Sequence, residues 1–214
     1  MPPPEKLSSR LVPAAGWLTE AQRKVAHLGF ILLPLELLHE VLPWPRGRGA
    51  WSLVLFGLVV VAVLTDLFRI HNRQVKQFFG RFFGELIREH EEFNLLGSTY
   101  LLMAALLAVG LFDRPLAAAA IGFTVLGDGM AAIVGRAYGR TRLFRKSLEG
   151  AAGGFAACLI WATYLHFTAH LPWPVVLTGA LVASLVELLP IPLDDNLGIT
   201  LFAGYAMKLF GNPS

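Results

Sequence analysis

The chain has 214 residues, of which 55% are hydrophobic and 15% are charged, and its formal net charge is +3. A mean hydropathy of +0.59 excludes an ordinary water-soluble enzyme and favours a membrane protein. The small positive charge gives no reason to expect nucleic-acid binding, and the single cysteine, Cys158, excludes an internal disulfide.

The chain begins with a proline-rich stretch, residues 1–18, that we expect to be loose, followed by one membrane domain over residues 19–212. Apolar runs of about 20 residues are long enough to cross a bilayer as helices. We therefore expect an all-α polytopic fold with about seven spans. The spans are expected at about 27–44, 51–70, 97–112, 115–135, 150–170, 173–190 and 196–211.

The positions of the cations predict the orientation of these spans. All Lys and Arg residues except Arg46, Arg48, Arg114 and Lys208 lie in the N-terminal segment or in the loops that would share its side of the membrane. Because cytoplasmic loops of membrane proteins are enriched in Lys and Arg, the N-terminus is expected in the cytoplasm. The sequence thus predicts an integral inner-membrane protein with its charged loops facing the cytoplasm.

The loop after the second span has the pattern of an amphipathic helix, over about residues 72–92. Its apolar residues, Val75 and the five residues Phe78, Phe79, Phe82, Phe83 and Leu86, recur at helical spacing, with cations between them. Such a helix is expected to lie in the cytoplasmic interface of the bilayer, beside the route by which a lipid would enter.

The stretch 127–150, GDGMAAIVGRAYGRTRLFRKSLEG, has the composition of a phosphate site. Asp128, Gly135 and Gly139 would share one face of a helix, with Arg136 and Arg140 beside it. Bare backbone allows a triphosphate to approach, guanidinium groups match its charge, and a carboxylate can hold a bridging divalent ion. Lys146, Ser147 and Glu149 follow at the start of the next span, where helix N-terminal amides favour an anion.

A second polar group is expected in the short cytoplasmic turn over residues 190–197. Asp194, Asp195 and Asn196 are adjacent there, and Glu187 precedes them. Two carboxylates and an amide at a bilayer surface can hold Mg²⁺ or accept a proton from an attacking hydroxyl. Helix capping would need only one of these residues.

The pattern D-x-x-A-x-x-x-G-R-x-x-G-R followed by K-S-x-E-G, from Asp128 to Gly150, resembles the cytidine-nucleotide signature of membrane enzymes that use CTP. These are the phosphatidate cytidylyltransferases and the CTP-dependent lipid-alcohol kinases (dolichol kinase, phytol kinase and fungal diacylglycerol kinase). The pattern E-x-x-P-x-x-x-D-D-N-L, from Glu187 to Leu197, is similar to the kinase branch. Shorter motifs also resemble that branch: Arg23-Lys24-x-x-His27, Asp66-x-x-Arg69, and Arg88-x-x-Glu91.

The resemblance implies a kinase that phosphorylates a lipid alcohol with CTP and Mg²⁺ (or Mn²⁺) and releases CDP. Gly135, Arg136, Gly139, Arg140, Lys146, Ser147 and Glu149 would bind the nucleotide. Asp128 with Asp194 or Asp195 would hold the metal, and the remaining aspartate or Asn196 would orient the hydroxyl. Asp66, Arg69, Arg88 and Glu91 would support the lipid site. The alcohol could be a polyprenol, phytol or diacylglycerol, and the sequence does not choose among them.

Two alternatives remain open at this point. A CTP:phosphatidate cytidylyltransferase would share the nucleotide motif, although this chain has Leu-Phe-Arg before Lys146 where that branch carries Ser-Pro-Lys. A transporter or scaffold would carry charges in mid-membrane, where only Glu36 and His39 are expected. A dinucleotide-binding fold is excluded, because no β-α-β pattern surrounds the G-x-G-x-x-A of Gly127 to Ala132. A homodimer is compatible with the sequence, which leaves the oligomeric state open.

Overall fold

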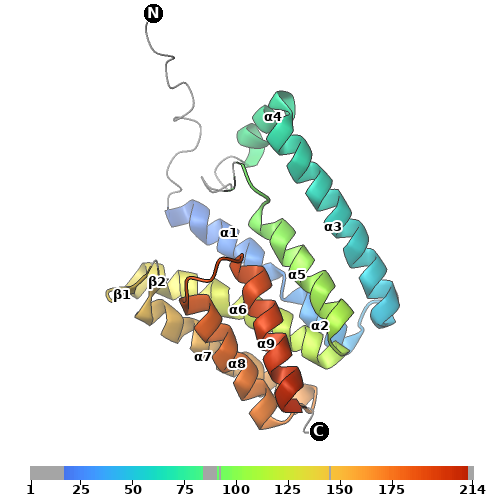
Figure 1. Ribbon diagram of the computed structural model, residues 1–214, viewed down its shortest axis with the longest axis vertical. Coiled ribbons are helices and arrows are strands. Elements are labelled where there is room, and N and C mark those ends of the chain that lie inside the picture. The colour runs from blue at the N-terminus through green and yellow to red at the C-terminus, as the bar shows by residue number, and fades with distance from the viewer. Residues whose placement is uncertain (1–16, 84–90, 92, 145, 212–214) are drawn as a thin grey trace, which may run out of the picture.

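The computed structural model describes residues 17–83, 91, 93–144 and 146–211, so most of the expected loose segment 1–18 lies outside the described residues. Within that part, the regular structure is helical except for one short hairpin (Figure 1). The elements are α1 (Trp17–Gly29), α2 (Leu32–His39), α3 (Gly47–His71), α4 (Arg73–Phe83), α5 (Gly97–Leu111), α6 (Arg114–Tyr138), β1 (Arg142–Leu143), β2 (Lys146–Ser147), α7 (Leu148–Thr168), α8 (Trp173–Leu188) and α9 (Asp195–Gly211).

Helix α6 lies at the centre of the bundle and contacts α1, α2, α5, α7, α8 and α9 (Figure 1). Every side chain from Ala117 to Val125 is buried. A helix that is apolar on all sides is stable only when other helices surround it, and the run Ala117–Ala120 keeps its own radius small. The sequence therefore makes α6 the element on which the other helices pack.

The contact between α6 and α7 depends on glycines. A Cβ on Gly150 would lie 2.7 Å from the backbone oxygen of Ala131, and a Cβ on Gly154 would lie 2.8 Å from that of Gly127. Both distances are shorter than a carbon–oxygen contact allows. The four-residue spacing of Gly150 and Gly154 thus brings two helix backbones together, as small residues do in membrane bundles.

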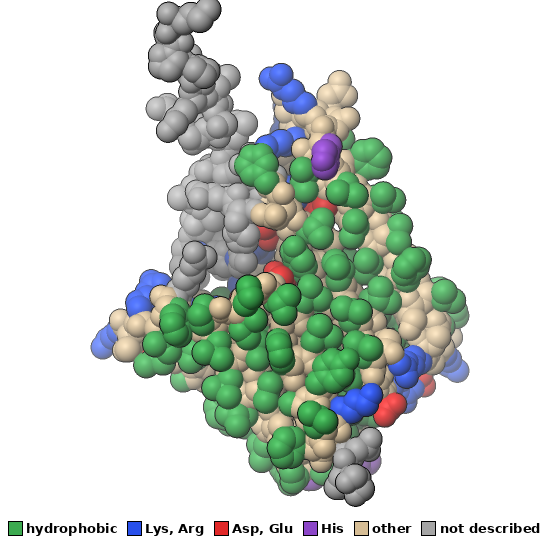
Figure 2. Space-filling view, viewed as in Figure 1, with side chains coloured by type: hydrophobic (Ala, Val, Ile, Leu, Met, Phe, Trp, Pro, Cys, Tyr) green, Lys and Arg blue, Asp and Glu red, His purple; other side chains and the backbone are tan. Residues whose placement is uncertain are grey.

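The face of the molecule in Figure 2 is hydrophobic over a broad area, with most of its visible charged side chains toward the margins. Three helices, α3, α6 and α7, are long and apolar enough to cross a membrane, and α5 and α8 are shorter apolar helices. An exposed apolar area of this kind is what a lipid bilayer covers. Its exposed residues recur at helical spacing: Leu53, Phe56, Val60 and Leu64 on α3, Leu177, Leu181 and Leu185 on α8, and Phe202, Tyr205 and Leu209 on α9.

The expected span over about 27–44 was wrong as a single helix. Helix α1 ends at Gly29, and α2 is a separate helix of eight residues. The cause is Pro34, which has no N–H and whose ring would clash with the carbonyl of Phe30 in a continuous helix. The other expected spans each correspond to one helix, but seven crossings are not confirmed, because only three described helices have the length and composition of a span.

A helix is present within the range 72–92 as far as it is described, and its place in the bilayer interface stays a prediction. Helix α4 covers Arg73–Phe83, and residues 84–90 and 92 lie outside the described residues. It follows α3 at Asn72, whose side-chain oxygen accepts hydrogen bonds from the backbone N–H groups of Gln74 and Val75. The Asn72 side chain thereby caps the helix that turns the chain away from α3.

Candidate active site

A cavity of about 650 Å³ opens between α1, α4, α5, α6 and the start of α9. One part of its wall is apolar and another carries charged and amide groups, a combination typical of sites for amphipathic ligands. The apolar part consists of Phe30, Phe79, Leu96, Leu101 and Leu102. The polar part includes Arg23, Lys24, His27, Glu91, Asp128, Asp194, Asp195 and Asn196.

Asp128 lies on α6 between two glycines, each of which allows a different helix to pack closely against α6. A Cβ on Gly127 would lie 2.9 Å from Cys158 Sγ on α7, and a Cβ on Gly129 would lie 2.6 Å from Leu28 Cδ2 on α1. Glycine at both positions lets α7 and α1 close on either side of α6. The two glycines of the Gly-Asp-Gly sequence thus allow close helix packing, while the Asp128 carboxylate between them faces the cavity.

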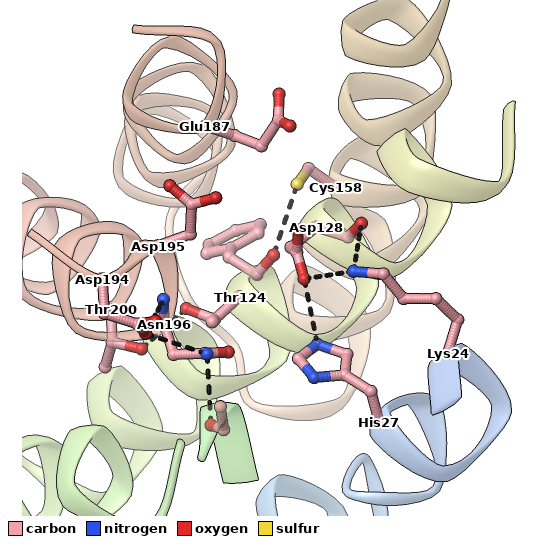
Figure 3. Close-up of polar contacts among 12 residues, drawn as sticks. Lys24, His27, Thr124, Asp128, Cys158, Glu187, Asp194, Asp195, Asn196 and Thr200 are labelled. Atoms are coloured by element: carbon pink, nitrogen blue, oxygen red, sulfur yellow. Dashed lines mark hydrogen bonds and ion pairs between the residues drawn. The ribbon is translucent and has the colours of Figure 1, made fainter. Parts of the chain in front are cut away.

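Helix α1 supplies that carboxylate with a cation from 104 positions away in the sequence. Lys24 Nζ donates a hydrogen bond of 2.7 Å to Asp128 Oδ2, and His27 Nε2 lies 3.6 Å from the same oxygen (Figure 3). Lys24 is only 3% exposed. A partly buried carboxylate is stabilised by a compensating charge, and Lys24 provides it here.

The Asp-Asp-Asn turn comes to the same cavity from the start of α9. Asp194 Oδ1 accepts hydrogen bonds of 2.9 Å from the backbone N–H and from the side-chain Nδ2 of Asn196. Asp194 therefore caps α9, and neither Asp195 nor Asn196 does so. Burial raises the pKa of Asp194, and the charges of Asp195 and Asp128 add to this effect, whereas the hydrogen bonds from Asn196 oppose it.

Asn196 joins this turn to the start of α5. Its Nδ2 also donates a hydrogen bond of 3.3 Å to the backbone oxygen of Gly97. These two bonds fix which way the amide points, and its Oδ1 is buried with no hydrogen-bond partner among the described residues. An unpaired buried acceptor is costly, so this oxygen is a ready place for a donor or a cation.

One helical turn away from Asp128 and Asn196, Thr124 on α6 and Thr200 on α9 share a hydrogen bond of 2.7 Å (Figure 3). Both residues are fully buried. Because Asp128 lies four residues after Thr124 and Asn196 lies four residues before Thr200, this bond holds the two polar groups on facing sides of α6 and α9.

Lys146 links the basic hairpin to the acidic turn. Its Nζ lies 3.0 Å from Asp195 Oδ2 and 3.2 Å from Glu187 Oε1, and it also donates to the backbone oxygen of Glu187. Burial lowers the pKa of Lys146, but the charges of Asp195 and Glu187 outweigh burial and raise it above its usual value. The ammonium group is therefore charged at neutral pH.

The remaining residues of the nucleotide motif surround the start of α7. A Cβ on Gly135 or Gly139 would meet Ser147 Oγ at 2.9 or 2.8 Å, so these glycines make room for Ser147. Ser147 Oγ accepts a hydrogen bond from Gly150 N and caps α7.

The carboxylate of Glu149 accepts hydrogen bonds from the backbone N–H groups of Arg140 and Thr141, which fixes the loop between α6 and the hairpin. The Arg136 and Arg140 side chains are exposed. Neither they nor the residues around Ser147 line the cavity; the motif reaches the acidic groups through Lys146.

Asp66, Arg69 and Glu91 form a buried polar group at the end of α3. Asp66 accepts hydrogen bonds from Arg69, from Thr99 Oγ1 at 2.7 Å and from the backbone of Leu96. Arg69 donates to the backbone oxygens at 91 and 94, and Glu91 accepts from Gly97 N. These contacts fix the turn that forms one rim of the cavity. Arg88 lies outside the described residues.

The expected metal ligands Asp128, Asp194 and Asp195 share one region but not one preformed cage. Among the described residues, no three His, Cys, Asp or Glu side chains lie close enough to enclose a metal ion. Mg²⁺ does not require such a cage, because it is held by one or two carboxylates together with substrate phosphates and waters. The buried Oδ1 of Asn196 and the carboxylates that line the cavity fit that more open coordination.

Sequence reasoning gave no role to several residues that line or support this site. Lys24 and His27 belonged to a resembling motif, but nothing in the sequence predicts that α1 folds against Asp128. The pairing of Thr124 with Thr200, 76 positions apart, leaves no local signal either. Glu187 was part of the acidic motif, and its contact with Lys146 could be found only from the packing of α8 against the hairpin.

Two curated proteins match most of the chain. An uncharacterized protein of Rickettsia prowazekii is 26% identical over 189 residues, covering 85% of this chain and 90% of that protein. A probable phytol kinase, chloroplastic, of Triticum aestivum is 31% identical over 216 residues, covering 90% of this chain and 68% of that protein. No protein-family profile and no solved structure matches the chain. From this identity and coverage, the chain belongs to the family of that probable phytol kinase.

Proposed function

We propose that this protein transfers the terminal phosphoryl group of CTP to the hydroxyl of a membrane lipid alcohol and releases CDP. The relationship to a probable phytol kinase supports a kinase of a lipid alcohol. The observation that carries the proposal is the cavity itself, in which an apolar wall meets a cluster of carboxylates. A long-chain alcohol has the matching form, since its tail is apolar and its hydroxyl needs a proton acceptor.

The apolar wall is built by two helices and a turn, between which a lipid could enter from the side. Phe79 comes from the interfacial helix α4, Phe30 from the turn after α1, and Leu101 and Leu102 from α5. With the tail against these side chains, the hydroxyl would lie toward the start of α9. A lipid would thus enter laterally, without crossing the polar side of the cavity.

Asp194 is the best placed group to accept the proton of the hydroxyl. It lines the cavity, its position is fixed by Asn196, and its pKa is raised. A general base works best when its pKa is closer to the operating pH than that of an ordinary aspartate. Phosphoryl transfer otherwise depends mainly on positioning and on charge, so no covalent enzyme intermediate is required.

Three cations of the 127–150 motif, Arg136, Arg140 and Lys146, would bind the phosphates of CTP. Lys146 is the central one, because it already bridges the hairpin and the acidic turn, and Arg136 and Arg140 are exposed. Asn196, with Asp128 or Asp195, would hold Mg²⁺, which would supply charge neutralisation at the phosphates. The excess of cations in the N-terminal and alternate loops supports an active site that faces the cytoplasm.

The test is to incubate the purified protein in detergent with Mg²⁺, γ-labelled CTP and, separately, phytol, a polyprenol, diacylglycerol and phosphatidate. Label in an organic-soluble product would establish the kinase and its alcohol, and unlabelled ATP or CTP in excess would show which nucleotide is used. Label released as pyrophosphate with phosphatidate as acceptor would instead establish a cytidylyltransferase. No turnover of any acceptor, by protein that remains folded, would refute both enzyme functions.

A further inference from the structure

Lys24 is a buried cation on the wall of a large cavity, which is an uncommon place for a lysine. Its ammonium group donates to Asp128 Oδ2 at 2.7 Å and lies 3.4 Å from the backbone oxygen of Asp128. The cavity is lined by Lys24 together with Asp194 and Asn196. Lys24 is thus in the same chamber as the groups proposed to act on the hydroxyl.

Helix α1 is seated firmly enough to hold Lys24 there. Gly129 brings α1 against α6, because Leu28 occupies the space that a Cβ would fill. His27 lies on the same side of α1, 3.6 Å from the carboxylate oxygen that Lys24 binds. Helix packing therefore fixes the position of Lys24, which is not a mobile surface side chain.

The pair raises an electrostatic conflict once a nucleotide and its metal arrive. A divalent cation on Asp128 would be strongly repelled by an ammonium group only 2.7 Å from the same carboxylate. Both cations can be retained if Lys24 exchanges Asp128 for a phosphate oxygen, because phosphate is a strong acceptor for lysine. The flexible four-carbon stem of lysine permits such a change of partner within the cavity.

We propose that Lys24 is a phosphate-binding residue of this site, held by Asp128 until the phosphates of the nucleotide take its ammonium group. This inference rests on the proposed function, because it needs a nucleotide in the cavity. It adds α1, more than 100 positions before the nucleotide motif, to the binding site. A purely structural role is the competing explanation: Lys24 would then serve only to neutralise Asp128.

The experiment replaces Asp128 first, so that the loss of Lys24 does not leave an unpaired carboxylate that would itself weaken CTP binding. CTP binding to Asp128→Asn and to the double variant Lys24→Gln/Asp128→Asn is measured in EDTA by calorimetry, at low salt and at about 1 M salt. At the higher concentration the screening length is about 3 Å, so an attraction that acts through solvent is weakened much more than a direct contact. The control is Lys208→Gln/Asp128→Asn, since Lys208 is an exposed cation on α9 that contacts the backbone oxygen of Leu111.

A direct contact predicts that the double variant with Lys24→Gln binds CTP at least about tenfold more weakly than Asp128→Asn at both salt concentrations. The Lys208 control should bind as Asp128→Asn does. Equal affinities, or a difference that vanishes at high salt, would overturn the proposal and leave Lys24 the structural role.

A second measurement covers the case in which Asp128→Asn does not fold. In the otherwise unchanged chain with Mg²⁺, Lys24→Gln should raise the KM for CTP at least about tenfold, and Lys24→Arg should restore most of it. A protein that binds CTP and phosphorylates an alcohol equally well with Lys24→Gln would overturn this inference alone. Failure of the unaltered protein to bind CTP would refute the proposed function as well.

Discussion

Lys146 Nζ lies 3.0 Å from Asp195 Oδ2, and this contact connects the two motifs that the sequence separates by 49 positions. It places the basic hairpin against the acidic start of α9, with Glu187 as a third member. A phosphate that bound Lys146 would therefore be brought beside the carboxylates that face the cavity. The contact gives the nucleotide motif and the acidic turn a common centre.

The acidic turn should be indispensable for turnover. We expect Asp194→Asn to lower kcat for alcohol phosphorylation at least about 100-fold with a small change in KM, because it removes a proton acceptor without changing the shape of the side chain. Steady-state kinetics in detergent would measure this. Asp113→Asn is the matched control, since Asp113 is exposed before α6 and makes no side-chain cap. Similar activity of the two variants would contradict the role of Asp194.

Lys146 should be required for the nucleotide more than for the fold. Lys146→Met is expected to lower kcat/KM for CTP about 100-fold or more, because a phosphate clamp loses its central cation. It also leaves Glu187 buried without its partner, so Lys146→Met/Glu187→Gln should recover thermal stability while activity stays low. Arg142→Gln, on the exposed strand β1, is the control and should be near wild type. Recovery of activity along with stability would show that Lys146 acts only structurally.

The approach of α6 and α7 should tolerate no added methyl group at Gly150. Gly150→Ala would place a Cβ 2.7 Å from the Ala131 backbone oxygen, and a backbone cannot move as easily as a side chain. We expect a loss of about 1–3 kcal/mol in the free energy of unfolding, with lower activity because Lys146 and Ser147 precede this position. Gly110→Ala, on α5, meets nothing within 4 Å and should leave the thermal midpoint unchanged or slightly raised. Equal midpoints would contradict the packing described for α7.

The buried group around Asp66 should control the rim of the cavity. Thr99→Val removes the 2.7 Å hydrogen bond to Asp66 Oδ2 and leaves a buried carboxylate oxygen with one fewer donor, at a cost of about 1–3 kcal/mol. Hydrogen exchange should then increase over residues 93–98, and the KM for the alcohol should rise. Thr99→Ser keeps the hydroxyl and should behave as wild type. Thr163→Val, which removes a hydroxyl from the exposed side of α7, is the control for the substitution itself.

The sequence-based prediction of the first span was wrong because it considered hydropathy and left out the effect of a proline on a helix. The span expected over 27–44 is interrupted at Phe30 and Ile31, because Pro34 prevents a continuous helix. The same break turns α1 so that it can pack on α6 at Gly129. Because the break was not predicted, the packing of Lys24 against α6 was not predicted either.

The sequence by itself determined the helical membrane character, the extent of most helices and the two polar motifs, because hydropathy and spacing are local properties of a chain. The tertiary structure alone decided which charges meet: Lys24 with Asp128, and Lys146 with Asp195 and Glu187. It also explains why glycines occur around Asp128 and Ser147, because helices approach closely there. Such contacts join residues far apart along the chain, so they depend on how the helices pack and not on any local pattern.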